Sequence, residues 1–424
     1  TTLLNAPVVI HPAGDPAWAT LATKLTAALT ARGAKGVECV TDLALMPARS
    51  APLPAAYRTR PLILLGNLNT NRALQPLYAD YLCSTDATYP GGDGFDLRTI
   101  VNPHGTGTNV ILAGGSNLRG ATRAVDRLLA AILQTDATLA VPFLLEVELA
   151  PDLAAQLAAW PFTPLDDTPD QQLLRNRSLL FYTEPIRVIG AYTLMWQWTG
   201  DARYATIARD TLRTLNERMT TGYGDWHYLA ERFMRAIPHL IAGGWLSDAD
   251  IARTDHLLML TALGNQDEWW RMREGRPPLG HRHQGKGTYE FLLLARYLRD
   301  QANPTPALRA LCDRWIAECC AFLDGLCRAC TDDQDDESSL NNLATLFRYS
   351  LGQERHEFFT SGRARQVARR CLALHDSNGN GAGQGGYGES QGMYLQQEAT
   401  PQVACSAFYY GDGELKWVLH TLNN

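Results

Sequence analysis

The 424-residue sequence contains no long uninterrupted run of apolar residues, although 46% of its residues are hydrophobic. A membrane-spanning helix needs about 20 consecutive apolar residues, so we expect no membrane span. The sequence also lacks a basic surplus, because 38 Lys and Arg stand against 44 Asp and Glu, for a formal net charge of −6. Proteins that bind nucleic acid through many phosphate contacts usually carry such a surplus, so we expect no nucleic-acid partner. An acidic substrate in a local basic cleft stays compatible with this charge.

The amino end, which begins at Thr1, lacks the pattern of a signal peptide. Such a peptide combines a basic start, a short apolar stretch and a cleavage site of small residues. We expect a secreted or periplasmic protein from which a signal peptide has been removed.

The nine cysteines do not have the spacing of a small disulfide-bonded scaffold, and their number is odd. Five of them trace one face of a helix, which predicts a buried, thiol-rich helix face rather than a metal site. These five are Cys312, Cys319, Cys320, Cys327 and Cys330. The sequence also lacks a phosphate-binding loop, a dinucleotide fingerprint and an H-E-x-x-H pattern. We therefore expect neither a cofactor nor a bound metal.

The first 150 residues alternate short apolar stretches with helical periodicity, which is typical of an α/β domain. The turns at Gly66-Asn67 and Gly114–Asn117 are interpreted as ordinary helix starts, because neither matches a phosphate-binding motif. Residues 151–170 are rich in Pro and Asp and are expected to form a linker. Strands are predicted at residues 6–12, 36–40 and 60–66, helices at residues 18–32 and 114–133, and a β-hairpin over residues 95–116.

From residue 171 to residue 424 the periodicity is almost wholly helical and contains a weak internal repeat. Each copy is an apolar helix that ends in an aromatic residue, a short polar turn and a second helix. Long loops rich in Gly and aromatic residues separate the copies, unlike the short uniform loops of open helical arrays. We therefore predict an α+β multidomain protein, in which a small N-terminal α/β domain precedes an all-α (α/α) toroid of helical hairpins. The copies are predicted at residues 193–212, 239–260, 292–315, 343–372 and 406–422.

The three longest loops between these copies carry aromatic, amide and basic side chains, which is the composition expected of a polysaccharide cleft. Aromatic rings stack on sugar faces, and Arg or Lys pairs with uronate carboxylates. The candidate substrate-binding residues are Tyr223, Trp226, Trp269, Trp270, Arg271, Arg273, Arg282, Lys286, Tyr387, Glu389 and Tyr394.

The stretch GHRHQGKGTYEFLLLARYL, residues 280–298, concentrates titratable groups where a helix is predicted to begin, after Gly287. Such a set suits β-elimination at a uronic acid: the carboxylate is neutralised, a base removes the C5 proton and an acid protonates the departing oxygen. Tyr289 can act as base and acid if Arg282 and Lys286 lie beside it, because a nearby cation favours an ionised phenol. The candidate catalytic residues are Tyr289, His281, His283, His227, Asn341 and Asn342, with the two Asn as amide partners for the carboxylate.

The segments GHRHQGKGTYEFLLLARYL, GGYGESQGMYLQQ and YYGDGELKW resemble the polysaccharide lyases with an α/α toroid, of the heparinase II/III and alginate-lyase type. In those families a Tyr, a His and an Asn in the toroid cleft carry out the elimination. The resemblance thus implies such roles for Tyr289, for His283 or His281, and for Asn341 or Asn342. The segment IVNPHGTGTNVILAGGSNLRGATRAVDRLL, residues 100–129, resembles the non-catalytic α/β domain that precedes the catalytic domain in several glycoside hydrolases.

Three alternatives stay open at this point. A glycoside hydrolase on the same toroid needs an opposed pair of carboxylic acids, for which the loops offer Asp225, Glu231, Glu290 and Glu389. A non-catalytic glycan-binding protein needs only the aromatic platforms. A metal site on His281 and His283 needs a third ligand, which His227 or Glu290 could supply.

Overall fold

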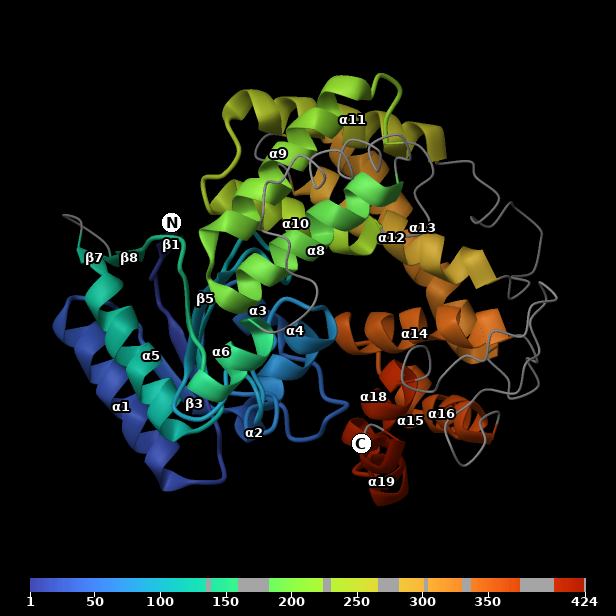
Figure 1. Ribbon diagram of the computed structural model, residues 1–424. Coiled ribbons are helices and arrows are strands. Elements are labelled where there is room, and N and C mark those ends of the chain that lie inside the picture. Colours follow the sequence, from blue (N-terminus) through green and yellow to red (C-terminus); the bar gives the residue numbers. More distant parts are fainter. Residues whose placement is uncertain are drawn as a thin grey trace. The chain divides into compact units, whose positions relative to one another are not determined.

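The computed structural model describes residues 1–134, 139–158, 183–223, 230–265, 282–300, 304–329, 337–373 and 400–422 (Figure 1). The chain divides into two compact units. One comprises Thr1–Asp225 with Leu229–Thr261, and the other comprises Trp226–Tyr228 with Ala262–Asn424. The first unit holds the described β-strands together with the first helical hairpins, and the second holds the later hairpins.

A six-stranded mixed sheet forms the centre of the first unit, and a small three-stranded sheet accompanies it. The strands are β1 (Thr2–Leu3), β2 (Val8–His11), β3 (Glu38–Thr41), β4 (Leu62–Gly66), β5 (Phe95–Ile100), β6 (Val110–Gly115), β7 (Leu133–Gln134), β8 (Leu139–Val141) and β9 (Leu145–Glu148). The large sheet has the order β3-β2-β4-β6-β5-β9 and the small one β1-β8-β7. Strands β3, β2, β4 and β6 are parallel, whereas β5 runs antiparallel to β6 and β9. The antiparallel pairing of β5 with β6 confirms the predicted β-hairpin.

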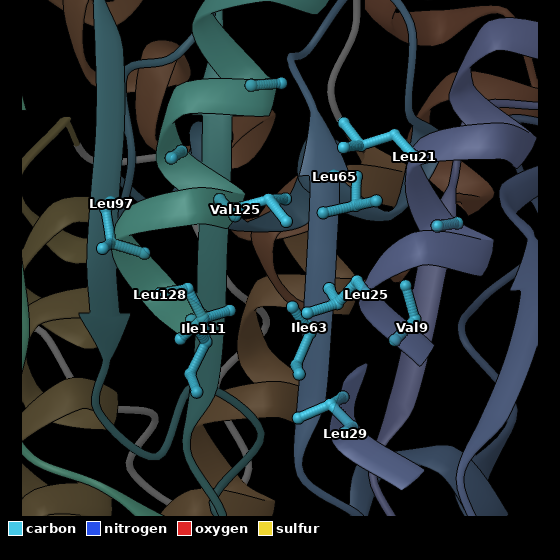
Figure 2. Close-up of a cluster of buried hydrophobic side chains, with 14 of the residues drawn as sticks. Val9, Leu21, Leu25, Leu29, Ile63, Leu65, Leu97, Ile111, Val125 and Leu128 are labelled. Carbon is cyan, nitrogen blue, oxygen red and sulfur yellow. The ribbon is translucent and has the colours of Figure 1, made fainter. Parts of the chain in front are cut away.

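Each face of the large sheet has its own apolar core, because successive side chains of a strand point to opposite faces. The helices of this region are α1 (Pro16–Ala31), α2 (Asp42–Leu45), α3 (Ala55–Arg58), η1 (Arg72–Leu74), α4 (Gln75–Ala79), α5 (Leu118–Ala131) and α6 (Pro151–Ala158). Val9, Ile63 and Ile111 pack with side chains of α1 and α5, as Figure 2 shows. Val8 and Leu62 point the other way and pack with residues of η1 and α4. The inner parallel strands β2, β4 and β6 are buried on both faces, which explains their largely apolar sequences, whereas the edge strand β3 is partly exposed.

Five pairs of successive helices follow residue 183 in the part of the chain that the structure describes. They are α8 (Thr183–Thr199) with α9 (Ala202–Arg218), α10 (Ala230–Ala242) with α11 (Asp248–Asn265), α12 (Arg282–Arg299) with α13 (Pro306–Ala329), α14 (Glu337–Gly352) with α16 (Arg363–Ala373), and α18 (Thr400–Tyr410) with α19 (Gly413–Leu422). The short helix α15 (Glu357–Thr360) lies in the turn of the fourth hairpin. In the first unit α8 packs against α9 and α10, and in the second α12 packs against α13 and α14. The α+β class is confirmed, and α8 packs with α9, α12 with α13 and α18 with α19 as in the predicted hairpins. The closure of the helices into a toroid stays a prediction.

The turn of the first hairpin shows how the local sequence ends one helix and begins the next. Gly200 has a φ of 70°, a conformation that favours glycine, and its N–H donates to the Trp196 carbonyl oxygen at 2.8 Å. The Asp201 carboxylate then accepts from the Arg203 N–H at 2.9 Å and caps α9. Gly200 and Asp201 therefore supply local signals that end α8 and begin α9.

Buried polar groups of the sheet layer complete the carboxyl end of α8. The guanidinium of Arg98 on β5 donates to the Gln197 carbonyl oxygen at 2.9 Å and lies 2.7 Å from the Asp96 carboxylate. The hydroxyl of Tyr89 donates to the Trp198 carbonyl oxygen at 2.7 Å. The last carbonyl groups of a helix have no partner within the helix, so these donors satisfy α8 from outside and complement its dipole. The first hairpin therefore belongs to the same compact unit as the sheet.

Several simpler predictions can be compared with this fold. The predicted thiol-rich face of α13 is confirmed at Cys312, Cys319, Cys320 and Cys327, which are all buried, while Cys330 lies outside the described residues. Among the described helices, none has the length and apolar character that a bilayer crossing requires. The domain boundaries at residues 150 and 170 stay predictions, because residues 159–182 are not described.

Candidate functional site

In the segment GHRHQGKGTYEFLLLARYL, residues 280–298, the helix begins earlier than the sequence predicts. Helix α12 begins at Arg282, so the prediction that it begins after Gly287 was wrong. Each glycine in a helix costs about 1 kcal/mol relative to Ala, and the sequence GKG therefore argued for a loop. Tertiary packing overrides that cost here: Gly285 is buried, and a Cβ atom at its position would lie 3.3 Å from Cδ1 of Leu326 on α13. The missing side chain allows α12 and α13 to approach closely.

The earlier start of α12 places the basic residues of the motif on the helix rather than on a preceding loop. Arg282, Lys286 and Tyr289 stand at positions i, i+4 and i+7, which lie along one face of an α-helix. Lys286 is half-buried and Tyr289 is fully buried, whereas the side chain of Arg282 lies outside the described residues. The proximity of a cation to the Tyr289 phenol stays a prediction.

The ring of Tyr289 packs against a second buried tyrosine. The centroids of the Tyr289 and Tyr349 rings are 6.2 Å apart, and the rings meet edge to face at 79°. The hydroxyl of Tyr349 on α14 donates to Oδ1 of Asp324 at 2.8 Å and lies 3.2 Å from the Cys320 carbonyl oxygen. Arg355 forms an ion pair with the other oxygen of the same carboxylate. The Tyr289 ring therefore contacts a hydrogen-bonded cluster that joins α13 to the carboxyl end of α14.

Burial and a hydrogen bond decide what the phenol of Tyr349 can do chemically. The pKa of Tyr349 lies far above its ordinary value, chiefly because burial disfavours the phenolate. The hydrogen bond that its hydroxyl donates to Asp324 also raises the pKa. Tyr349 therefore stays a neutral hydrogen-bond donor at any physiological pH and is unsuited to acid–base catalysis.

Tyr223, a predicted substrate-binding residue, lies in the first unit and is fully buried. Its hydroxyl donates to Oδ1 of Asn216 at 2.7 Å, its N–H donates to Oγ1 of Thr261 at 2.8 Å, and its ring packs 5.2 Å from that of Phe233. Burial raises the pKa of Tyr223 above its usual value. These contacts describe a residue that holds helices together, and the geometry adds no support to its predicted contact with substrate.

Most of the other predicted site residues lie outside the described part of the chain, so the structure does not bring them together. For four of them, only the helix position is described. Arg282 and His283 stand in the first turn of α12, and Asn341 and Asn342 stand in the second turn of α14. The residues that are not described are His227, Trp226, Trp269, Trp270, Arg271, Arg273, His281, Tyr387, Glu389 and Tyr394. Within the described segments, no three His, Cys, Asp or Glu side chains are grouped so that they could hold a metal ion.

The Gly-Asn turns of the sheet layer use their polar groups within the fold. Asn117 caps α5, because its Oδ1 accepts from the Gly120 N–H at 3.0 Å, as predicted for a helix start. Asn67 begins no helix, and its amide instead donates to the carbonyl oxygens of Gly115 and Ser116 at 3.0 and 3.1 Å. The amide of Asn71 donates to the carbonyl oxygens of two neighbouring strands, β2 and β4. These side chains tie the strand ends together, which is a structural role.

The cluster of Asp324, Tyr349 and Arg355 was missed by the sequence analysis. Tyr349 falls within the predicted repeat copy at residues 343–372, and the three residues carry no recognisable spacing. Asp324 lies 25 residues before Tyr349 and 31 before Arg355, so only the packing of α13 against α14 and its following turn brings them together. No local pattern could have shown this cluster.

Comparisons with protein-family models, with curated proteins and with solved structures gave no significant match for any part of the chain.

Proposed function

We propose that this chain is a polysaccharide lyase that cleaves a uronic-acid-containing polysaccharide by β-elimination. The helical hairpins form an (α/α) toroid that carries the cleft, and the N-terminal sheet layer acts as a non-catalytic accessory domain. The protein works outside the cytoplasm, in a secreted or periplasmic location. The observation that carries the proposal is the face of α12 that presents Arg282, Lys286 and Tyr289 at positions i, i+4 and i+7.

The proposed reaction assigns one role to each kind of side chain. An amide from Asn341 or Asn342, or a cationic side chain such as Arg282, neutralises the uronate carboxylate and makes the C5 proton more acidic. Tyr289, ionised beside Lys286, removes that proton, and His281, His283 or His227 assists the transfer. The electron pair forms the C4–C5 double bond as the bond from C4 to the glycosidic oxygen breaks. The tyrosine hydroxyl then returns the proton to the departing oxygen, so the enzyme ends in its starting state.

Burial of Tyr289 sets a requirement for this proposal. Its side chain has no exposed surface, so substrate binding must open a path to the phenol oxygen. In this proposal the carboxylate approaches from the side of Lys286, which is half-buried on the same helix face. An acidic polysaccharide is favoured over a neutral one because it pairs with these cations.

The test measures the ultraviolet absorbance of the unsaturated uronate product on a panel of polyuronates, with a neutral polysaccharide as the substrate control. We expect wild-type protein to generate the chromophore and Tyr289→Phe to lose it while keeping its fold by circular dichroism. Tyr410→Phe is the matched control, because Tyr410 also lies in the second unit and donates to the Phe359 carbonyl oxygen at 2.6 Å. Retention of full activity by Tyr289→Phe would remove the basis of the mechanism.

A glycoside hydrolase is the second candidate, because Glu290 is fully buried next to Tyr289 on α12. A buried carboxyl group can be kept protonated and act as a general acid. This function predicts new reducing ends without the unsaturated chromophore, and their loss in Glu290→Gln. Binding to polyuronates without either product would instead favour a glycan-binding protein.

A further inference from the structure

Three helices of the second unit meet behind the ring of Tyr289. Tyr289 lies on α12, Tyr349 on α14 and Asp324 on α13, and the turn after α14 contributes Arg355. The contacts run in series, from the edge-to-face ring pair to the Tyr349–Asp324 hydrogen bond and then to the ion pair with Arg355. Tyr289 and Tyr349 are both fully buried, whereas Asp324 is partly exposed and Arg355 is exposed, so the series runs from the core of the unit to its surface.

The hydrogen bond fixes the ring of Tyr349 more firmly than packing alone. Its hydroxyl faces two acceptors, Oδ1 of Asp324 at 2.8 Å and the Cys320 carbonyl oxygen at 3.2 Å. A hydrogen bond to a charged acceptor is roughly twice as strong as a neutral one. Arg355, whose side chain is exposed, forms an ion pair with the Asp324 carboxylate and helps to orient this acceptor. A ring held at its hydroxyl end presents a constant surface to the neighbouring ring.

We propose that Tyr349 and Asp324 are positioning residues for Tyr289, and that they hold its phenol in the orientation needed for proton abstraction. This inference rests on the proposed function, in which Tyr289 is the base. An edge-to-face pair has a preferred geometry, so rotation of one ring displaces the other. Displacement of a catalytic group by about 1 Å lowers the rate of the chemical step much more than it weakens substrate binding. Neither Tyr349 nor Asp324 touches substrate in this arrangement.

The kinetic test compares single and double variants of the full chain. We expect Tyr349→Phe and Asp324→Ala each to lower kcat roughly tenfold with KM changed less than about twofold. The double variant is no slower than either single one, because both remove the same hydrogen bond. Asp324→Asn retains most of the activity, since its amide oxygen still accepts the hydrogen bond from the Tyr349 hydroxyl. Tyr410→Phe, which loses a comparable hydrogen bond elsewhere in the unit, keeps the wild-type kcat.

A second measurement observes Tyr289 directly and does not depend on activity. Fluorotyrosine is incorporated throughout the chain, and the fluorine resonance of Tyr289 is assigned from its absence in Tyr289→Phe. We expect this resonance to shift or broaden in Tyr349→Phe and in Asp324→Ala, and to stay unchanged in Tyr410→Phe. An unchanged Tyr289 resonance overturns the inference, whatever happens to the rate. Absence of elimination by the wild-type protein overturns the proposed function instead, and the resonance still decides whether the cluster orients Tyr289.

Discussion

His239 shows at the scale of one residue how burial becomes a pH dependence. It is buried on α10, and its Nδ1 lies 2.9 Å from the Arg235 carbonyl oxygen. Burial lowers the pKa of His239 to about 4, and the nearby charges of Arg98 and Arg235 act in the same direction. Because the folded pKa lies below that of the unfolded chain, the unfolded state binds the proton first as the pH falls. Stability is therefore lost between about pH 6.5 and pH 4.

The corresponding prediction concerns acid sensitivity. We expect His239 to account for the loss of about 2 kcal/mol of the free energy of unfolding between about pH 7 and pH 5. Urea unfolding of wild-type protein and His239→Gln at both pH values measures this, and the variant should be less sensitive to acid. His420→Gln, at an exposed histidine of α19, is the control and should behave as wild type. Equal acid sensitivity in wild type and His239→Gln would contradict the prediction.

A second prediction at this scale concerns Lys286, which shares one face of α12 with Arg282 and Tyr289. Its ammonium group favours the ionised form of the Tyr289 phenol in the proposed reaction. Replacement by Gln removes the charge and keeps most of the length, so we expect kcat/KM to fall roughly tenfold and the pH–rate profile to move to higher pH. Lys416→Gln on α19 is exposed and should leave the profile in place. A uniform loss of rate without any change in the profile would show that the charge does not act on the base.

At the scale of the elements, the end of α8 depends on a buried ion pair of the sheet. Arg98 donates to the Gln197 carbonyl oxygen and pairs with Asp96, and both charged side chains are almost fully buried. Removing one partner leaves the other charge uncompensated. We expect Arg98→Met to lower the free energy of unfolding by about 3–5 kcal/mol, as measured by urea unfolding.

The control for the Arg98 prediction is a surface pair of the same unit. Lys24 and Asp126 form an exposed ion pair, and Lys24→Met should cost little, because solvent screens exposed charges. The double variant Asp96→Leu with Arg98→Met should be more stable than Arg98→Met alone, since it leaves no unpaired charge. A double variant that is less stable than Arg98→Met would show that shape, rather than charge, dominates this junction.

Helix–helix distance provides another prediction at this scale. Gly190 on α8 is buried, and a Cβ atom there would lie 2.7 Å from Cβ of Arg232 on α10. We expect Gly190→Ala to lower the free energy of unfolding by about 1–3 kcal/mol, because α8 and α10 must separate. Gly264→Ala on α11 meets no atom within 4 Å and should instead stabilise the chain by up to about 1 kcal/mol through helix propensity. Thermal unfolding of the two variants, side by side, should give shifts of opposite sign.

At the scale of the whole molecule, a net charge of −6 has to coexist with the binding of a polyanion. The proposed function resolves this through local pairs between cations and uronate groups. Added salt screens such pairs over about 10 Å at 0.1 M, so we expect KM for a polyuronate to rise several-fold with salt while kcat changes little. A KM that falls with salt would indicate that overall repulsion, rather than local pairing, controls binding.

The sequence by itself determined the elements whose signals are local. Short apolar runs located strands β2 to β6, and turns such as Gly200-Asp201 located successive helices, because both depend on neighbouring residues in the chain. The same reasoning failed at Gly287, where close packing of α12 on α13 outweighs a local preference against helix.

The contacts around the proposed site were decided by tertiary structure alone. The burial of Tyr289, its contact with Tyr349 and the Asp324–Arg355 pair join residues that are far apart in the chain. Such contacts depend on the summed packing of whole helices rather than on any short pattern, which is why the sequence indicated the chemical groups of the site but not their arrangement.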